Sequence, residues 1–146
     1  MSVAVSLDRL REEATGRSAA YLLTVGSDGR PHSVSVLVGW DEDALVMAAG
    51  NRSVANAGER PLVSLLWPPV ERGGFSLIVD ATVSSVTGNG AGDNRIVVTP
   101  TRAVLHRPAD PGSAGSPGSD CAARGRTNRE HPDEPDGARV TGRLSL

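Results

Sequence analysis

The sequence predicts a mainly β fold, an antiparallel barrel of six short strands that is closed or half-closed, with a short helix at the N-terminus. One observation is a series of short apolar runs, rich in Val, Leu and Ile, that are separated by Gly, Pro, Asn and Asp. This pattern is typical of all-β domains. The other is the stretch 20–38, in which two such runs flank Ser27-Asp28-Gly29-Arg30. Asp-Gly between β-branched runs indicates a β-hairpin, because Gly readily adopts the positive φ of a tight turn.

The large apolar residues are concentrated in the first part of the chain. The chain has 146 residues. There are 34 large apolar residues between Ser2 and Arg107 and only three from Pro108 onward. We therefore predict one β-barrel domain over residues 1–107 and a disordered, Pro/Gly/Ser-rich tail over residues 108–146. Such a tail buries too little apolar surface to offset its ordering entropy. A domain of this size covers its core incompletely, so a second subunit is expected to help.

Charge and composition exclude several classes of protein. The formal net charge is −2 and the basic residues form no block, so we expect neither nucleic acid nor an anionic membrane surface as a partner. All 15 basic residues are Arg, which excludes Schiff-base chemistry on a lysine. No apolar run approaches the roughly 20 residues of a membrane span. Cys121 is the only cysteine, so no internal disulfide forms, and we expect a cytoplasmic protein.

The remaining elements follow from the apolar runs and the residues that interrupt them. A short helix is expected over residues 6–15, with Ser6 as its cap and with Leu7, Leu10 and Ala14 on one face. After the hairpin and an acidic turn, further strands are expected over residues 44–49, 62–67, 75–86 and 95–106. The run 62–67 is nearly all apolar, so we expect it to be buried on both faces. Pro100 cannot donate a ladder hydrogen bond and marks a bulge or an edge.

The second strand of the hairpin has two different faces. Ser33 and Ser35 alternate with His32, Val34, Val36 and Val38, and period-2 alternation places the two sets on opposite sides of a strand. The serines either face water, which is the commoner case, or line a shallow polar groove for a flat ligand.

The linker after the strand at 44–49 contains the best candidate for a binding site. We expect one or two helical turns over residues 53–58, with Ser53 as N-cap and Gly58 as the C-terminal stop. The free N–H groups of a helix N-terminus bind phosphate, and the neighbouring Arg52 adds a charged donor. Asn56 lies one turn further and can add an amide. The alternative is that Ser53 only caps the helix and Arg52 is a solvated side chain, since helix caps far outnumber anion sites.

No metal site or catalytic group is predicted. The candidate ligands, which are His32, His106, His131 and Cys121, are too scattered in the sequence for a metal centre. No side chain has the setting of an obligatory acid or base, so the sequence names no catalytic residue.

Four consecutive segments together resemble one known superfamily. They are Y-L-L-T-V-x-x-D-G-R-P-H-S-V-S-V, A-L-V-M-A-A-G-N-R-S-V-A-N, R-P-L-V-S-L-L-W-P and G-F-S-L-I-V-D-A. In this order they are similar to the pyridoxamine 5′-phosphate oxidase-like, FMN-binding split β-barrel proteins. The likeness is greatest to small actinobacterial members, some of which use the deazaflavin F420. The resemblance covers about residues 7–107 and implies a six-stranded antiparallel split β-barrel.

The resemblance also implies a cofactor, an assembly and a set of site residues. Members are homodimers that hold a flavin in each of two clefts between subunits, and they act on small-molecule substrates. The strand at 32–38 lies beside the isoalloxazine ring, which makes Ser33, Ser35 and Val36 candidates for ring contacts. The linker holds the phosphate, which makes Arg52, Ser53 and Asn56 candidates there.

Two functions therefore remain open. The first is an oxidoreductase that uses FMN, or F420, and transfers hydride to or from a small organic substrate. The second is a split barrel without redox turnover that serves as a ligand carrier, a haem-handling protein or an interaction module. We predict the first and keep the second as the alternative. The alternative is supported by the linker, which lacks the family's usual Lys and has Ala57 after Asn56 in place of Leu.

Overall fold

The computed structural model describes residues 1–88 and 93–110, so the predicted tail beyond residue 110 and the loop residues 89–92 lie outside the described residues. The described part is mainly β, as predicted, and it contains eight strands, one 3-10 turn and two α-helices. In chain order these are β1 (Ser2–Val5), η1 (Leu7–Arg9), α1 (Leu10–Ala14), β2 (Ala20–Val25), β3 (Pro31–Val36), β4 (Val38–Asp41), β5 (Ala44–Ala48), α2 (Asn51–Glu59), β6 (Leu62–Trp67), β7 (Ser76–Thr87) and β8 (Arg95–His106).

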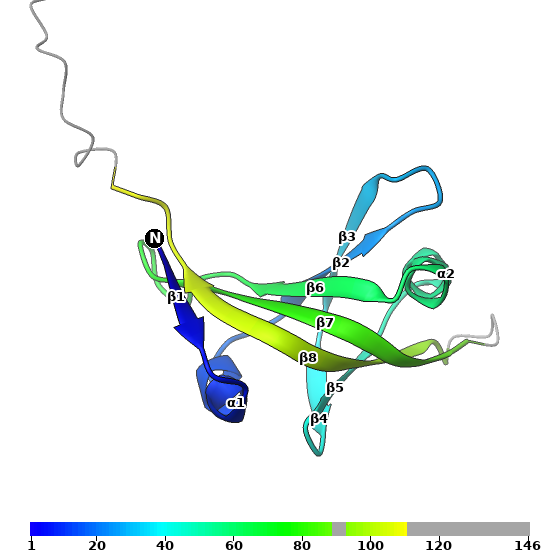
Figure 1. Ribbon diagram of the computed structural model, residues 1–146, viewed down its shortest axis with the longest axis horizontal. Coiled ribbons are helices and arrows are strands. Elements are labelled where there is room, and N and C mark those ends of the chain that lie inside the picture. Colours follow the sequence, from blue (N-terminus) through cyan, green and yellow to red (C-terminus); the bar gives the residue numbers. More distant parts are fainter. Residues whose placement is uncertain (89–92, 111–146) are drawn as a thin grey trace, which may run out of the picture. The chain divides into compact units, whose positions relative to one another are not determined.

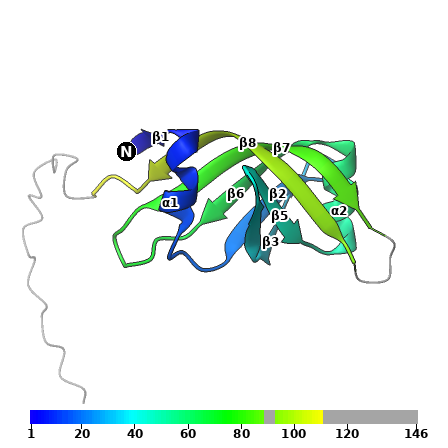
Figure 2. The same ribbon diagram turned by 90° about the horizontal axis from the view of Figure 1, so that it is seen from below.

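All strands belong to one antiparallel sheet that curls into a half-barrel. The strand order is β3-β2-β6-β7-β8-β5-β4, and β1 pairs with the second half of β8, while β5 pairs with its first half. The strands at the two ends of this order, β3 and β4, are consecutive in the chain with only Leu37 between them. The two edges of the sheet must therefore come together where the chain passes from β3 through Leu37 into β4. Figures 1 and 2 show the curl of the sheet.

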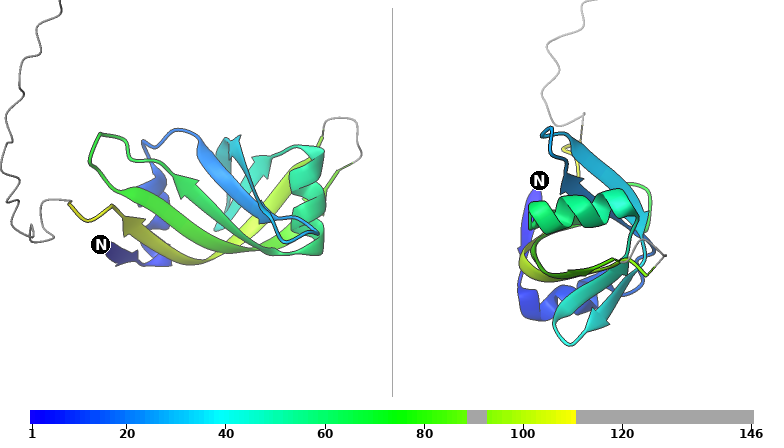
Figure 3. Two further views of the ribbon diagram at one scale, coloured as in Figure 1. Left: turned by 90° about the horizontal axis from the view of Figure 1, so that it is seen from above. Right: turned by 90° about the vertical axis from the view of Figure 1, so that its right-hand side faces the viewer.

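The concave face of the sheet holds the core, and the helices lie at opposite ends of it. α2 lies across one end of the curled sheet, whereas η1 and α1 pack at the other (Figures 1 and 3). Alternate residues of each strand point inward, as period-2 alternation requires. Fully buried side chains from five strands and from α1 form one cluster, which includes Leu10, Leu22, Leu45, Met47, Leu65, Leu77, Val79, Ile96 and Val98.

The predicted hairpin and the predicted bulge are both confirmed. β2 and β3 pair from Ala20↔Val36 to Val25↔Pro31. Gly29 has φ of +79°, and the turn is held by hydrogen bonds from the N–H of Gly26 to the carbonyl of Arg30 (2.9 Å) and from the N–H of Arg30 to Asp28 Oδ1 (3.1 Å).

The bulge lies in β8, where Asp80 pairs with Arg102 but the next residue of β7, Ala81, pairs with Pro100. One extra residue, Thr101, is therefore accommodated beside the proline, which has no N–H to give to the ladder.

Two strands were not predicted. β1 gains its partner only when the chain folds back onto Ala103–His106, and β4 lies in the stretch interpreted as a turn. Burial on both faces was wrong for β6, because its residues alternate and Leu62 is 73% exposed on the outer side. Apolar content alone does not distinguish a doubly covered strand from one with an uncovered outer face.

Both helix starts differ from the prediction. The N-terminal segment divides into the 3-10 turn η1 and a five-residue α1, and the Ser6 side chain makes no cap hydrogen bond. In the linker, the helix starts earlier and ends later than expected, so Gly50 is the N-cap, Ser53 is its third residue and the helix passes Gly58. Among the described residues, neither helix has the length and apolar character needed to cross a bilayer.

Candidate functional site

The N-terminus of α2 is left without a side-chain cap. Gly50 occupies the N-cap position in an extended conformation (φ −70°, ψ 167°), and it has no side chain to accept a hydrogen bond from the first turn. The first hydrogen bond of the helix runs from the N–H of Val54 to the carbonyl of Gly50 (3.1 Å). The preceding N–H groups have no helical acceptor, and together with the helix dipole they favour an anion at this end.

Arg52 and Ser53 stand in this first turn, in contrasting environments. The Arg52 side chain is exposed and makes no hydrogen bond or ion pair with the described residues. Ser53 is 1% exposed, and its Oγ has no hydrogen-bond partner in the described part of the chain. A buried hydroxyl without a partner is destabilising unless a ligand atom or an ordered water meets it.

Asn56 has an internal partner. Its Nδ2 donates a hydrogen bond to Thr24 Oγ1 (3.1 Å), and both side chains are buried. Thr24 pairs with His32 across the hairpin, so this bond fixes the middle of α2 beside the start of β3. The predicted amide of Asn56 is therefore engaged inside the protein, where it positions α2.

β3 offers one polar face and one free edge. Ser33 and Ser35 point to the exposed side, as their alternation predicted, whereas Val36 is 5% exposed and belongs to the core. Val36 therefore has only its backbone to offer a ligand. Within the described sheet β3 pairs on one side only, with β2, so alternate N–H and C=O groups of its other edge have no strand partner.

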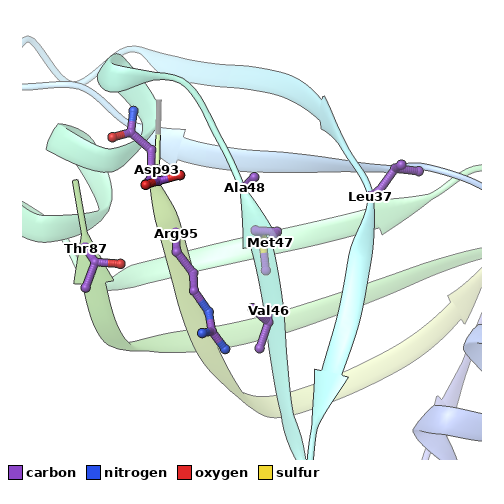
Figure 4. A pocket seen from close by; sticks show the side chains of 8 residues that line it. Leu37, Val46, Met47, Ala48, Thr87, Asp93 and Arg95 are labelled. Carbon is purple, nitrogen blue, oxygen red and sulfur yellow. The ribbon is translucent and has the colours of Figure 1, made fainter. Parts of the chain in front are cut away.

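A hollow of about 540 Å³ opens where the two edges of the sheet meet. It is lined by Leu37, by Val46, Met47 and Ala48 of β5, and by Thr87, Asp93, Asn94 and Arg95 (Figure 4). Asn94 connects it with α2, because its Nδ2 donates to Asn51 Oδ1 (2.6 Å). Gly88 allows this approach, since a Cβ there would lie 2.8 Å from Asn94 Oδ1 and 3.2 Å from Val54 Cγ1.

Comparison with known proteins gives sequence relatives and structural relatives. No protein-family model matches the chain. Uncharacterized proteins of Mycobacterium bovis and Mycobacterium tuberculosis are each 37% identical over 120 residues, which covers 75% of this chain and 84% of each of them. The structure of an F420 reductase aligns with a TM-score of 0.53 at 20% identity. The alignment covers 63% of this chain and 94% of the reductase chain.

Two further solved structures have the same arrangement of strands. A putative pyridoxamine 5′-phosphate oxidase from Listeria innocua gives a TM-score of 0.55 at 15% identity, over 68% of this chain and 96% of its own. HutZ, the haem storage protein of Vibrio cholerae, gives a TM-score of 0.50 at 14% identity, over 66% of this chain and 91% of the HutZ chain. The chain has the half-barrel fold of these solved structures. It belongs to the same sequence family as the two mycobacterial proteins.

The predicted site residues divide into an exposed group and a buried group. Arg52, Ser33 and Ser35 are exposed, whereas Ser53, Asn56 and Val36 are buried. The family resemblance named these residues, but it did not reveal which of their side chains are buried. Whether these residues hold a cofactor stays a prediction.

The sequence analysis missed the hollow and its polar residues Asn94 and Arg95. Both lie at the start of β8, far in sequence from β5, and only the pairing of β5 with β8 places them next to Ala48. The local sequence gives no sign of this contact, because Gly-rich loops followed by Asn and Arg are common at strand starts.

Proposed function

We propose that this split barrel is an oxidoreductase that binds FMN, or the deazaflavin F420, and acts on a small organic substrate. The observation that carries the proposal is the N-terminus of α2, which has no side-chain cap and has in its first turn an Arg52 without a partner among the described residues. When bound, such a cofactor supplies the hydride-transfer chemistry, and the protein supplies binding, orientation and electrostatics.

The first turn of α2 fits a phosphate group. Its free N–H groups and the Arg52 guanidinium are all donors, and a phosphate offers several charged acceptor oxygens. Gly50 leaves open space at the N-cap, since a Cβ built there meets no atom within 4 Å. Ser53 Oγ is covered by protein atoms, so the donors open to a phosphate are the N–H groups and Arg52.

β3 is the element that we assign to the ring of the cofactor. Ser33 and Ser35 present small hydroxyls on its exposed face, and the free edge of the strand presents backbone donors and acceptors. These groups would bind and orient a flat heterocycle. No described side chain is assigned as a catalytic acid or base.

The homodimer is part of the proposal. It is supported by large apolar side chains that the described chain leaves exposed on the sheet, such as Tyr21 and Leu62. Light scattering should give twice the chain mass. A monomer at micromolar concentration would contradict the dimer and weaken the flavin assignment, because the superfamily's clefts lie between subunits.

The alternative is a split barrel that binds a ligand or haem without redox turnover. It is supported by the likeness to HutZ and by a phosphate linker that has no Lys. The two functions differ in a simple titration. The oxidoreductase hypothesis predicts a yellow complex with FMN or tight binding of F420. The alternative predicts a haem absorption band after addition of haem, and no flavin binding.

The test substitutes Arg52→Ala and measures the affinity for FMN and for riboflavin, which lacks the phosphate. A charge-assisted hydrogen bond to phosphate contributes about 1.5–3 kcal/mol. Its loss should weaken FMN binding roughly tenfold to a hundredfold, at 1.4 kcal/mol per decade, while riboflavin binding should hardly change. Arg60→Ala is the matched control, because Arg60 follows the C-terminus of the same helix and pairs with Glu59 (3.0 Å).

Equal losses for FMN and riboflavin would show that the substitution disturbs the whole cleft. Unchanged FMN affinity would remove Arg52 from the site and leave the N–H groups of the helix as the phosphate ligands. No binding of FMN or F420 to the unsubstituted protein would reject the proposed function.

A further inference from the structure

The hollow at the sheet closure combines an apolar wall with one cationic side chain. Leu37 is 78% exposed, and Val46 and Ala48 belong to the outward face of β5. Asn94, Thr87 and Arg95 provide the polar groups at its opposite side (Figure 4). A concave, largely apolar surface with a few convergent polar groups is the usual form of a small-molecule site.

Arg95 is available to a ligand. Among the described residues its only partner is Asp41, at 3.8 Å between Nη2 and Oδ2, and the two side chains are 54% and 66% exposed. Such a long, exposed ion pair contributes little and exchanges readily. A guanidinium offers a planar pair of N–H donors, which matches the two oxygens of a carboxylate.

Two neighbouring carboxylates narrow the class of anion. Asp93 lines the hollow, and Asp41 lies 3.8 Å from the Arg95 guanidinium. With Arg95 these two carboxylates give a local formal charge of −1 (+1 − 2), so the net electrostatic repulsion grows with the charge of the anion. A singly charged carboxylate therefore fits better than a doubly charged phosphate.

The other hollows have a different character. The one beside α1 is lined by three acidic side chains, Asp8, Glu42 and Asp43, and its Arg11 already lies over the Trp40 ring (5.4 Å to the centroid). In the one over β6 and β7, Ser64 and Arg102 already occupy the Asp80 carboxylate, at 2.8 and 3.4 Å. Of these three hollows in the described part of the chain, the one at Leu37 presents a weakly paired cation beside an apolar wall.

We propose that the hollow bounded by Leu37, β5 and the start of β8 binds a small organic carboxylate with an apolar body, and that Arg95 is its specificity-determining residue. Asn94 joins this hollow to the N-terminus of α2 through Asn51, so the site is contiguous with the assigned cofactor site. That the carboxylate is the substrate rests on the proposed function, whereas the binding itself does not.

The test uses the full chain without added cofactor, with benzoate, phenyl phosphate and the uncharged benzamide as probes. Titrations followed by amide chemical shifts should place benzoate at Val46, Ala48 and Arg95. Benzoate should bind more tightly than phenyl phosphate or benzamide. Arg95→Ala should weaken benzoate binding by about three- to tenfold, since the ion pair is partly exposed, and should leave benzamide binding unchanged. Higher ionic strength should weaken benzoate binding alone.

Arg102→Ala is the matched control, because Arg102 lies on the same strand, is similarly exposed and also pairs with an aspartate. The proposal is overturned if benzoate at millimolar concentration causes no chemical-shift change, or if the changes lie outside the hollow. It is also overturned if benzamide binds as tightly as benzoate, or if Arg102→Ala has the effect expected of Arg95→Ala. Because the protein is flavin-free, a chain that binds benzoate and rejects FMN would keep this site and lose the proposed function. A chain that binds FMN and does not bind benzoate would keep the proposed function and lose this site.

Discussion

The two ends of the half-barrel are covered by helices that differ in how completely their polar groups are satisfied. At the end covered by α1, Arg17 donates hydrogen bonds to three backbone carbonyls, those of Glu13 (3.0 Å), Pro68 (3.2 Å) and Phe75 (2.9 Å). It thereby ties the helix to the loop between β6 and β7. Arg107 also lies over the Phe75 ring, 4.9 Å from its centroid.

The end covered by α2 is the opposite case. The helix begins at a glycine that cannot cap it, Arg52 has no partner in the described part of the chain, and Ser53 buries a hydroxyl without one. Neither end has a helix with a side-chain cap, but among the described residues the α2 end alone also buries a side-chain hydroxyl without a partner. This difference supports the proposal of a ligand site at the α2 end.

The largest effect that separates the two ends is expected from Leu10→Ala. Leu10 is 1% exposed and anchors α1 in the core, so its truncation should lower the free energy of unfolding by about 2–5 kcal/mol. Urea denaturation measures this loss. At temperatures where the variant stays folded, its FMN affinity should match that of the parent. A weakened affinity would show that the two ends are coupled and would contradict this prediction.

An intermediate effect is expected from Thr24→Val, at the hydrogen bond that positions α2. Valine keeps the shape but removes the acceptor, which leaves the Asn56 amide buried and unpaired at a cost of about 1–3 kcal/mol. Thr24→Ser is the control, because it keeps the hydroxyl and loses one methyl group. Thermal unfolding of both variants decides the point, and equal melting temperatures would mean that the hydrogen bond contributes nothing.

The smallest effect on stability is expected from Gly50→Asp, which should change stability and FMN affinity in opposite directions. A capping carboxylate should stabilise the ligand-free protein by a few tenths of a kcal/mol to about 1 kcal/mol. The same charge should repel the phosphate and weaken FMN binding. Gly50→Asn caps without charge and should stabilise the protein with a smaller loss of affinity. If Gly50→Asp raised FMN affinity, the phosphate would not lie at this end of the helix.

The local sequence determined the elements whose signals are complete within a few residues. Asp28-Gly29 between β-branched runs determined the β2–β3 hairpin, because the turn needs one positive φ and its strands pair directly. Residues 95–106 and 62–67 were predicted with the bounds that β8 and β6 have. The alternation in β3 placed Ser33 and Ser35 on the outside for the same local reason.

Tertiary structure decided everything that depends on a partner distant in the chain. β1 is a strand only because β8 accepts it, and Asn56 is a positioning residue only because Thr24 lies opposite. The hollow exists because Leu37 joins the two edges of the sheet and β8 brings Arg95 beside Ala48. Hydrogen bonds and burial are pairwise properties, so a sequence read one segment at a time identifies the donors and acceptors, and only the fold determines which of them remain free for a ligand.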